Sequence, residues 1–228
     1  MSRFAVALST TLLAGAALLT IPGGGAGASD SCVAWASLPA RVALSGHAVE
    51  VRSTLQGTPA CTGVTADAGA HALLNGPGPS TSDYPMLWTH LGDTDSATMY
   101  ASFTVPGTYT IRGADLKTYD ERYFHIPNQW RATSTTVKYA GRFAGVTRTS
   151  LTIAATLQFH DRYEWRSHGN VAVALQRRTG GTWQTVARAE TSGQGRVVFR
   201  AGSGTYRLTS ATTGLVWSTA RSLGTSRV

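Results

Sequence analysis

The segment from residue 160 to residue 168 carries the side chains best suited to binding chemistry. It reads His-Asp-Arg-Tyr-Glu-Trp-Arg-Ser-His. Tyr163 and Trp165 offer flat apolar faces with polar edges, which suit a sugar ring or a protein partner. Arg162 and Arg166 offer planar donors for carboxylate or phosphate. The segment lies between two strand-like stretches, so we expect a loop at one end of a β-sandwich and predict these four residues as its ligand-binding set. The alternative is a solvated loop whose charges pair locally and whose tryptophan covers an end of the core.

Two acidic or histidine-containing clusters also have metal-ligand side chains. The first is His160, Asp161, Glu164 and His168. Their types fit zinc, but their spacing matches no established ligand pattern. Asp93-Thr94-Asp95 suggests calcium, yet the further oxygen ligands of an EF-hand loop, including its twelfth-position Glu, are absent from the sequence. A polar turn is the favoured interpretation, and we predict no metal and no other cofactor.

Enzymatic motifs are missing from the sequence. It contains no Gly-x-Ser-x-Gly elbow, no His-Glu-x-x-His helix motif and no glycine-rich phosphate loop. Ser, His and Asp occur only as scattered residues, whereas a hydrolase needs a nucleophile beside a base or a carboxylate pair. We therefore predict no catalytic residue and no enzyme, with an extracellular enzyme of unrecognised type as the less favoured alternative.

The first 28 residues have the three parts of a secretory signal peptide. Arg3 supplies a positive charge, residues 4–21 are apolar, and Ala26-Gly27-Ala28 is a small-residue cleavage site. Cleavage after Ala28 would leave no transmembrane segment in the mature chain. A retained membrane anchor is the alternative, which the helix-breaking Pro22 and the following glycines disfavour. We expect a secreted protein, extracellular or associated with the cell envelope.

The chain has two cysteines, Cys32 and Cys61. An even count in an exported chain predicts a disulfide bond, and two free thiols are the alternative. Closing a loop of this length stabilises a fold by roughly 3 to 4 kcal/mol in the chain-entropy model.

Charge divides the exported chain into two unlike halves. Residues 29–127 carry five basic and nine acidic residues, whereas residues 128–228 carry fourteen basic and three acidic residues. This asymmetry predicts a domain boundary near residue 128, with one domain at 29–127 and a basic one at 128–228. A basic exported domain favours an anionic extracellular polymer, glycan or protein partner over nucleic acid. The alternative is that arginine simply serves as the soluble surface residue of this half.

A short repeat supports the same division. Gly107-Thr108-Tyr109 returns 97 residues later as Gly204-Thr205-Tyr206. A tyrosine that enters a late strand just after a glycine-containing turn is typical of a tyrosine corner in a β-sandwich. We therefore predict that Tyr109 and Tyr206 are structural corner residues in two tandem copies of one unit.

Alternation of apolar and polar residues predicts short strands throughout. In the first half they fall at residues 32–35, 49–55, 71–74, 86–88, 99–105, 109–111 and 123–126. In the second half they fall at residues 151–159, 171–175, 183–186, 197–199, 206–208 and 218–223, with a hairpin turn at Gly180-Gly181. Trp88 and Trp183 lie at matching distances before the two tyrosines. The fold class predicted is all-β, as two tandem immunoglobulin-like, Greek-key β-sandwiches joined near Pro127 to Arg131, where Trp130 could dock against either body.

Several second-half motifs together point to a family. They are Val173-Ala174-Leu175-Gln176-Arg177-Arg178, Gly181-Thr182-Trp183, Val186-Ala187, Gly195 and Gly204-Thr205-Tyr206-Arg207-Leu208. Residues 171–221 resemble the bacterial immunoglobulin-like repeats common in secreted proteins of actinobacteria, and the first half resembles them more weakly. The resemblance implies a sandwich of about seven strands used as a spacer, adhesion or binding module, with no catalytic motif to carry over. Antibody domains place a core cysteine two residues after the corner tyrosine, whereas Ile111 and Leu208 stand there in this chain.

The sequence thus predicts a secreted, non-catalytic binding or adhesion protein, attached to the cell envelope through its basic half. A carbohydrate-binding module that uses Tyr163, Trp165 and Trp217 is the alternative.

Overall fold

The structure is a computed structural model that describes residues 32–46, 48–59, 61, 69–77, 83–117, 123–125 and 130–226. The predicted signal peptide at residues 1–28 lies outside the described residues, as does most of the predicted joint from Pro127 to Arg131. The described part contains no helix with the length and hydropathy that a membrane crossing requires.

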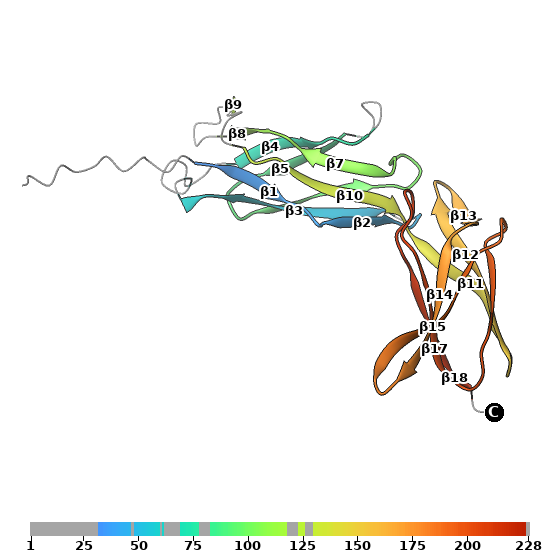
Figure 1. Ribbon diagram of the computed structural model, residues 1–228. Coiled ribbons are helices and arrows are strands. Elements are labelled where there is room, and N and C mark those ends of the chain that lie inside the picture. Colours follow the sequence, from blue (N-terminus) through green and yellow to red (C-terminus); the bar gives the residue numbers. More distant parts are fainter. Residues whose placement is uncertain are drawn as a thin grey trace, which may run out of the picture. The chain divides into compact units, whose positions relative to one another are not determined.

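The described chain is built almost wholly from β-strands (Figure 1). The first ten are β1 (Ala34–Ser37), β2 (Arg41–Leu44), β3 (Val49–Gly57), β4 (Gly69–Leu74), β5 (Tyr84–Trp88), β6 (Thr94–Met99), β7 (Gly107–Ile111), β8 (Ala114–Lys117), β9 (Tyr123–His125) and β10 (Thr133–Tyr139). The others are β11 (Gly141–Arg148), β12 (Thr152–Asp161), β13 (Glu164–Ser167), β14 (Ala172–Thr179), β15 (Thr182–Glu190), β16 (Arg196–Arg200), β17 (Gly204–Ser210) and β18 (Ala220–Ser226). The all-β prediction is confirmed.

Strands β1 to β10 form a first sandwich. One layer has the order β1-β3-β6, and the other contains the sheets β2-β10-β7 and β5-β4-β8-β9. These last two sheets join where Asn75 and Thr110 exchange backbone hydrogen bonds of 3.0 and 2.8 Å. All three sheets contribute buried side chains to one core, among them Leu55, Ile111 and Trp88.

Strands β11 to β18 form a second sandwich with Greek-key connections. In one sheet β12 pairs with β11 on one side and with β13 and β16 on the other. The other sheet has the order β15-β14-β17-β18, so β14 pairs with the distant β17 rather than with β16. The Gly180-Gly181 hairpin is confirmed: both glycines have positive φ, and Thr179 pairs with Thr182 across the turn.

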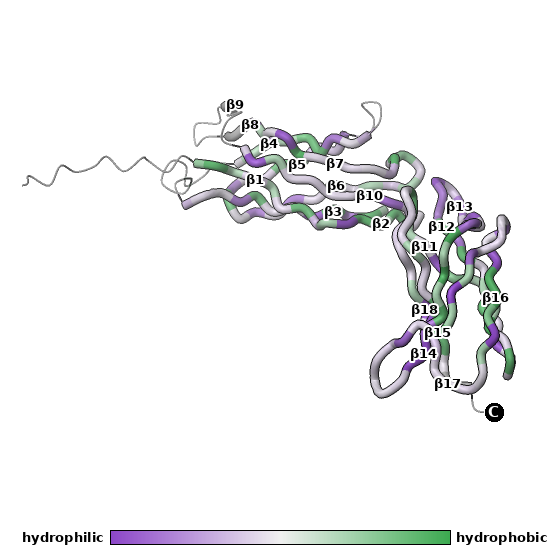
Figure 2. Tube along the Cα trace, in the orientation of Figure 1, coloured by the Kyte–Doolittle hydropathy of each residue, from purple (hydrophilic) through white to green (hydrophobic). Residues whose placement is uncertain are grey.

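Alternating burial explains why these residues form a sandwich. In β14 the buried Val173 and Leu175 alternate with more exposed neighbours, and in β16 Val197 and Phe199 do the same. Figure 2 shows apolar and polar residues following one another along the strands of the second sandwich. Successive side chains of a strand point to opposite faces, so one face of each sheet enters the second core. Each large apolar side chain buried in this way stabilises the fold by roughly 1.5–3 kcal/mol.

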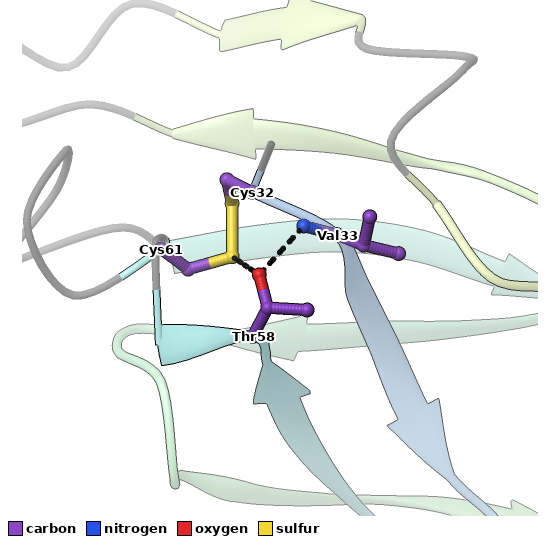
Figure 3. The surroundings of a disulfide bond; sticks show 4 residues. All are labelled: Cys32, Val33, Thr58 and Cys61. Atoms are coloured by element: carbon purple, nitrogen blue, oxygen red, sulfur yellow. Dashed lines mark hydrogen bonds between the residues drawn. A yellow bond between two sulfur atoms is a disulfide. The ribbon is translucent and has the colours of Figure 1, made fainter. Parts of the chain in front are cut away.

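The predicted disulfide joins Cys32 to Cys61, whose Cα atoms are 4.4 Å apart (Figure 3). It ties the residues before β1 to the segment after β3. The Thr58 hydroxyl accepts a 3.1 Å hydrogen bond from the Val33 amide and lies 3.7 Å from the Cys61 sulfur. A bonded sulfur carries no hydrogen, so the hydroxyl is the donor in that second contact. Thr58 therefore holds both ends of the bridge together.

The two repeated tyrosines enter their cores at equivalent strands, β7 and β17. Tyr109 is fully buried and its hydroxyl donates a 2.9 Å hydrogen bond to the carbonyl of Val105. Tyr206 is buried as well, but its hydroxyl is 3.5 Å from the carbonyl of Ser203, at the limit of a hydrogen bond. Both rings occupy the core beside Ile111 or Leu208, which are themselves buried.

Strand β10 was not predicted, and it bears on the expected boundary at residue 128. Although it follows that boundary, β10 pairs with β2 in parallel and with β7 antiparallel, both in the first sandwich. Trp130 also packs against the first core. Ala140 alone separates β10 from β11 in the chain. Judged by strand pairing, the chain therefore passes from the first sandwich to the second at this residue. The division of the chain into domains at 29–127 and 128–228 stays a prediction.

Two further details differ from the sequence prediction. The apolar alternation from Met99 to Val105 predicts a strand, but β6 ends at Met99 and a turn follows, in which the Tyr100 carbonyl accepts from two later amides. Phe103 is consequently 70% exposed. Trp88 and Trp183 do lie on strands at matching places, but Trp88 is buried and donates to the Ser53 carbonyl, whereas Trp183 is only partly buried.

Candidate binding surfaces

The predicted ligand-binding segment is a hairpin, not a loop. His160 and Asp161 end β12, Glu164 to Ser167 form β13, and only Arg162 and Tyr163 make the turn. The expectation of a loop is wrong because the alternating pattern of β12 continues through the polar residues, and Asp161 pairs with Glu164 in a tight turn. We call residues 160–167 the tip hairpin.

Two of the four predicted binding residues, Trp165 and Arg166, are engaged in local contacts within the second sandwich. The guanidinium of Arg142 lies 3.9 Å from the centroid of the Trp165 ring, and His160 packs edge-on against the same ring at 5.1 Å. Arg166 lies 3.2 Å from Asp161 and 3.3 Å from Glu164. Since both carboxylates bind this guanidinium, Arg166 is a poor receptor for a further anion.

The other two predicted residues stand at the turn. Tyr163 is 78% exposed and Arg162 is exposed beside it. The structure therefore brings the four residues onto one hairpin without gathering them into one site. Tyr163 and Arg162 are therefore the two predicted residues that remain accessible at the turn.

The residues considered as zinc ligands are not gathered either. His160 is buried against Gly46, where an added Cβ would lie 2.1 Å from the imidazole. His168 packs against Phe159 instead, and burial lowers its pKa. Asp161 and Glu164 bind Arg166. Within the described residues, no three His, Cys, Asp or Glu side chains are placed to hold a metal ion.

The pair considered for calcium closes a turn. The Asp93 carboxylate accepts hydrogen bonds from the Thr89 hydroxyl and the His90 amide, and the Asp95 carboxylate accepts a 2.6 Å bond from the Leu87 amide. The hydroxyl of Thr89 is the main reason that the pKa of Asp93 is lowered. Asp93 thus caps the turn before β6, while Asp95 lies on the strand itself, and the absence of calcium stays a prediction.

Trp217, named with the carbohydrate alternative, is engaged in packing. Its indole nitrogen donates a 2.7 Å hydrogen bond to the carbonyl of Val42. Arg41 and Lys138 lie 4.8 and 5.0 Å from its ring centroid. These contacts join the β17–β18 connection to β2 and β10, so the ring serves the packing of the chain.

A second surface emerges on the sheet β15-β14-β17-β18, on the side away from the core. We call it the outer face. It presents Gln176 and Arg178 of β14, Trp183 and Arg188 of β15, and Arg207 and Thr209 of β17. These positions alternate with the buried Val173, Leu175, Tyr206 and Leu208. Over the three strands lies a hollow of about 360 Å³, with small residues such as Ala172 and Ala174 along it.

The register arranges the outer face in rows. In one row Ala174 lies between Arg188 and Thr209. In the next Gln176 lies between Thr185 and Arg207, and in the third Trp183 lies beside Arg178. The Arg207 guanidinium is 4.6 Å from the Trp183 ring centroid and donates a 2.5 Å hydrogen bond to the Gln176 carbonyl oxygen. The Gln176 amide then donates to the Thr185 hydroxyl at 3.2 Å. This chain of contacts fixes the orientation of two side chains that can recognise a ligand.

Charge on the outer face is one-sided. The outer face carries three arginines, Arg178, Arg188 and Arg207, and one carboxylate, that of Glu190, which lies at the end of β15 beside Ala172. Sequence reasoning missed this surface because its members are spread over three strands. The signal was present, however: the Gly180-Gly181 turn sets the register, and alternate residues on its two flanks are arginine, glutamine, threonine and tryptophan.

Comparison with known proteins finds no family and only distant structural similarity. No protein-family model and no curated protein matches the chain. Among solved structures, domains NIE-MG1 of native alpha-2-macroglobulin from Escherichia coli are 12% identical, with 84% of this chain and 97% of that chain covered and a TM-score of 0.32. The D00-D0 domain of intimin is 11% identical over 82% of this chain and 96% of that one, with a TM-score of 0.26. A tetra-tandem repeat of a large adhesion protein is 12% identical over 85% of this chain and 50% of that one, with a TM-score of 0.29. These scores are too low to carry an argument about this chain.

Proposed function

We propose that this protein is a non-catalytic, extracellular binding protein that attaches to an anionic polymer of the cell envelope through its second sandwich. The observation that carries the proposal is how few of its arginines form ion pairs with carboxylates. Among the described residues beyond Gly141, Arg166 alone lies within ion-pair distance of a carboxylate. The remaining positive charge is not neutralised within that part of the protein and creates a field that attracts polyanions.

Not every arginine is equally available to contact a polyanion. The Arg148 guanidinium donates to the carbonyls of Gly204 and Gly224, so it serves the fold. Arg178, Arg188, Arg196 and Arg200, by contrast, are exposed on their strands. The Cys32–Cys61 disulfide is consistent with an oxidising compartment, where an exported protein would work.

The test is a sedimentation assay with isolated cell envelopes and the chain from residue 29 onward. We expect the protein to pellet with the envelopes at low ionic strength and to be released as salt screens the charges beyond a Debye length of about 10 Å at 0.1 M. Protein that stays in solution at low salt would overturn the proposal. Neutral latex particles of similar size supply the control for non-specific adsorption.

A second candidate is glycan recognition by the tip hairpin, which the 78% exposure of Tyr163 favours. A Tyr163→Ala variant separates the two: under the main proposal it pellets like the parent protein, whereas under this alternative it stays in solution.

A further inference from the structure

We infer that the outer face of the second sandwich is the polymer-binding site and that its ligand is a linear polysaccharide bearing carboxylate groups. This inference rests on the proposed function and narrows it to one face and one ligand class. Three features of the outer face support it: the spacing of the arginines, the polar groups between them, and the shape of the surface.

The arginines recur along the strands. Arg188 shares a row with Ala174, and Arg178 lies four residues further along β14. At 3.3–3.4 Å per residue these rows are about 13 Å apart, and the row of Arg207 falls between them. A single small anion meets only one such row. A chain with repeated anionic groups meets all three.

The groups between the arginines suit sugar hydroxyls. Gln176 offers an amide that both donates and accepts, and Thr185 and Thr209 offer hydroxyls that do the same. Gln176 is held by Arg207 and Thr185, so its rotamer is already chosen before a ligand arrives. Arginine binds a carboxylate with two parallel hydrogen bonds, which gives the anionic group a defined direction.

The shape admits an extended chain. Small residues, among them Ala172 and Ala174, line the hollow of about 360 Å³, while Arg188 and Gln176 stand at its sides. A sugar ring can therefore approach the sheet between longer side chains. Trp183 lies beyond Gln176 with one ring face covered by Arg207, so its main effect is to hold that guanidinium in place.

The test compares two double variants of equal charge. Arg178→Gln with Arg188→Gln removes two exposed arginines from the outer face, and Arg196→Gln with Arg200→Gln removes two exposed arginines from β16 of the other sheet. Binding is measured by calorimetry to a uronic-acid oligosaccharide, to its carboxyl-reduced neutral form, and to a polyphosphate of equal charge. Matching thermal midpoints establish that both variants fold.

We expect the outer-face variant to lose about tenfold or more in affinity for the uronic-acid oligosaccharide and the β16 variant to lose about twofold or less. The carboxyl-reduced neutral oligosaccharide should bind neither of the two double variants. A Gln176→Leu variant should also weaken binding while leaving its salt dependence unchanged, because no charge is removed.

Some results would refute the proposed site or ligand and leave the proposed function standing, and one would refute the proposed function itself. Equal losses in the two double variants would mean diffuse attraction, so envelope binding would stand and the site would fall. Polyphosphate that binds as tightly as the uronic-acid oligosaccharide would refute the ligand class. Failure of the parent chain to bind envelopes at all would refute the proposed function, whatever the oligosaccharide does.

Discussion

The two sandwiches hold the same Gly-Thr-Tyr motif by different means. In the first, the Tyr109 hydroxyl makes a 2.9 Å hydrogen bond to Val105, and the ring lies so close to Gly76 that an added Cβ there would come within 2.0 Å of it. In the second, the Tyr206 hydroxyl reaches Ser203 at only 3.5 Å, and Arg148 lies 5.3 Å from the ring centroid. Arg148 also donates to the carbonyls of Gly204 and Gly224, which lie on β17 and β18.

The Gly-Thr-Tyr motif therefore specifies a buried tyrosine but not the contacts that support it. The first sandwich relies on a hydroxyl, a close-packed glycine and a disulfide, whereas the second relies on a guanidinium. The basic composition of the second half is therefore partly architectural. Only the arginines on exposed strand faces are available to a ligand.

The largest expected effect concerns the disulfide. Replacing Cys32 and Cys61 by serine should lower the free energy of unfolding of the first sandwich by about 3–4 kcal/mol, because the unfolded chain regains the entropy of an open loop. Hydrogen exchange followed by mass spectrometry measures this separately for β3 and for β14. Protection should fall in β3 and persist in β14. Equal loss in both strands would show that the sandwiches unfold as one unit and would end the comparison.

The next effect concerns Arg148. An Arg148→Met variant keeps the length of the side chain but loses its charged hydrogen bonds to two backbone carbonyls, so the second sandwich should lose about 2 kcal/mol. Urea denaturation gives this value. Arg196→Met is the matched control, since Arg196 is exposed on β16 of the same sheet, and it should change stability by less than about 0.5 kcal/mol. If the two variants behave alike, Arg148 is not the support of the second corner.

The smallest effect concerns the two hydroxyls. Tyr109→Phe should cost about 1 kcal/mol because it removes a well-formed hydrogen bond and leaves the Val105 carbonyl without it. Tyr206→Phe should cost less than about 0.5 kcal/mol, because a 3.5 Å contact contributes little. Both are read from thermal midpoints under identical conditions. A larger cost at Tyr206 would reverse the comparison.

Most strands followed from alternation, and the reasons for the exceptions are physical. The patterns at Val49 to Leu55 and at Leu151 to Phe159 correspond to β3 and β12, although Leu151 itself lies outside the strand and is exposed. Strands β10 and β11 were missed because their threonines, arginines and glycines hide the two-residue period. The strand predicted through Phe103 is absent because the chain turns at Tyr100 to Phe103, a choice made by hydrogen bonds that the apolar pattern does not encode.

The candidate site was harder to predict than the fold. A cluster in sequence drew attention to residues 160–168, but pairing within the tip hairpin uses Arg166 and Trp165 internally. The outer face collects residues from 172 to 211, which only the pairing of β14 with both β15 and β17 brings together. The residue types indicated which chemistry was available, but only the strand register shows where on the surface those side chains come together.

The continuity of β10 and β11 has a mechanical consequence. Strand β2 runs parallel to β10 over four residue pairs, and Ala140 is the one residue between the end of β10 and the start of β11, the first strand of the second sandwich. Tension between the start of β2 and the end of β10 would slide these strands past each other, so that all four pairs resist together. A hairpin such as β14–β15, pulled at its open end, would instead open one pair at a time. A protein that is held at its second sandwich and pulled through its first would thus load its hydrogen bonds in shear, the direction in which they break last.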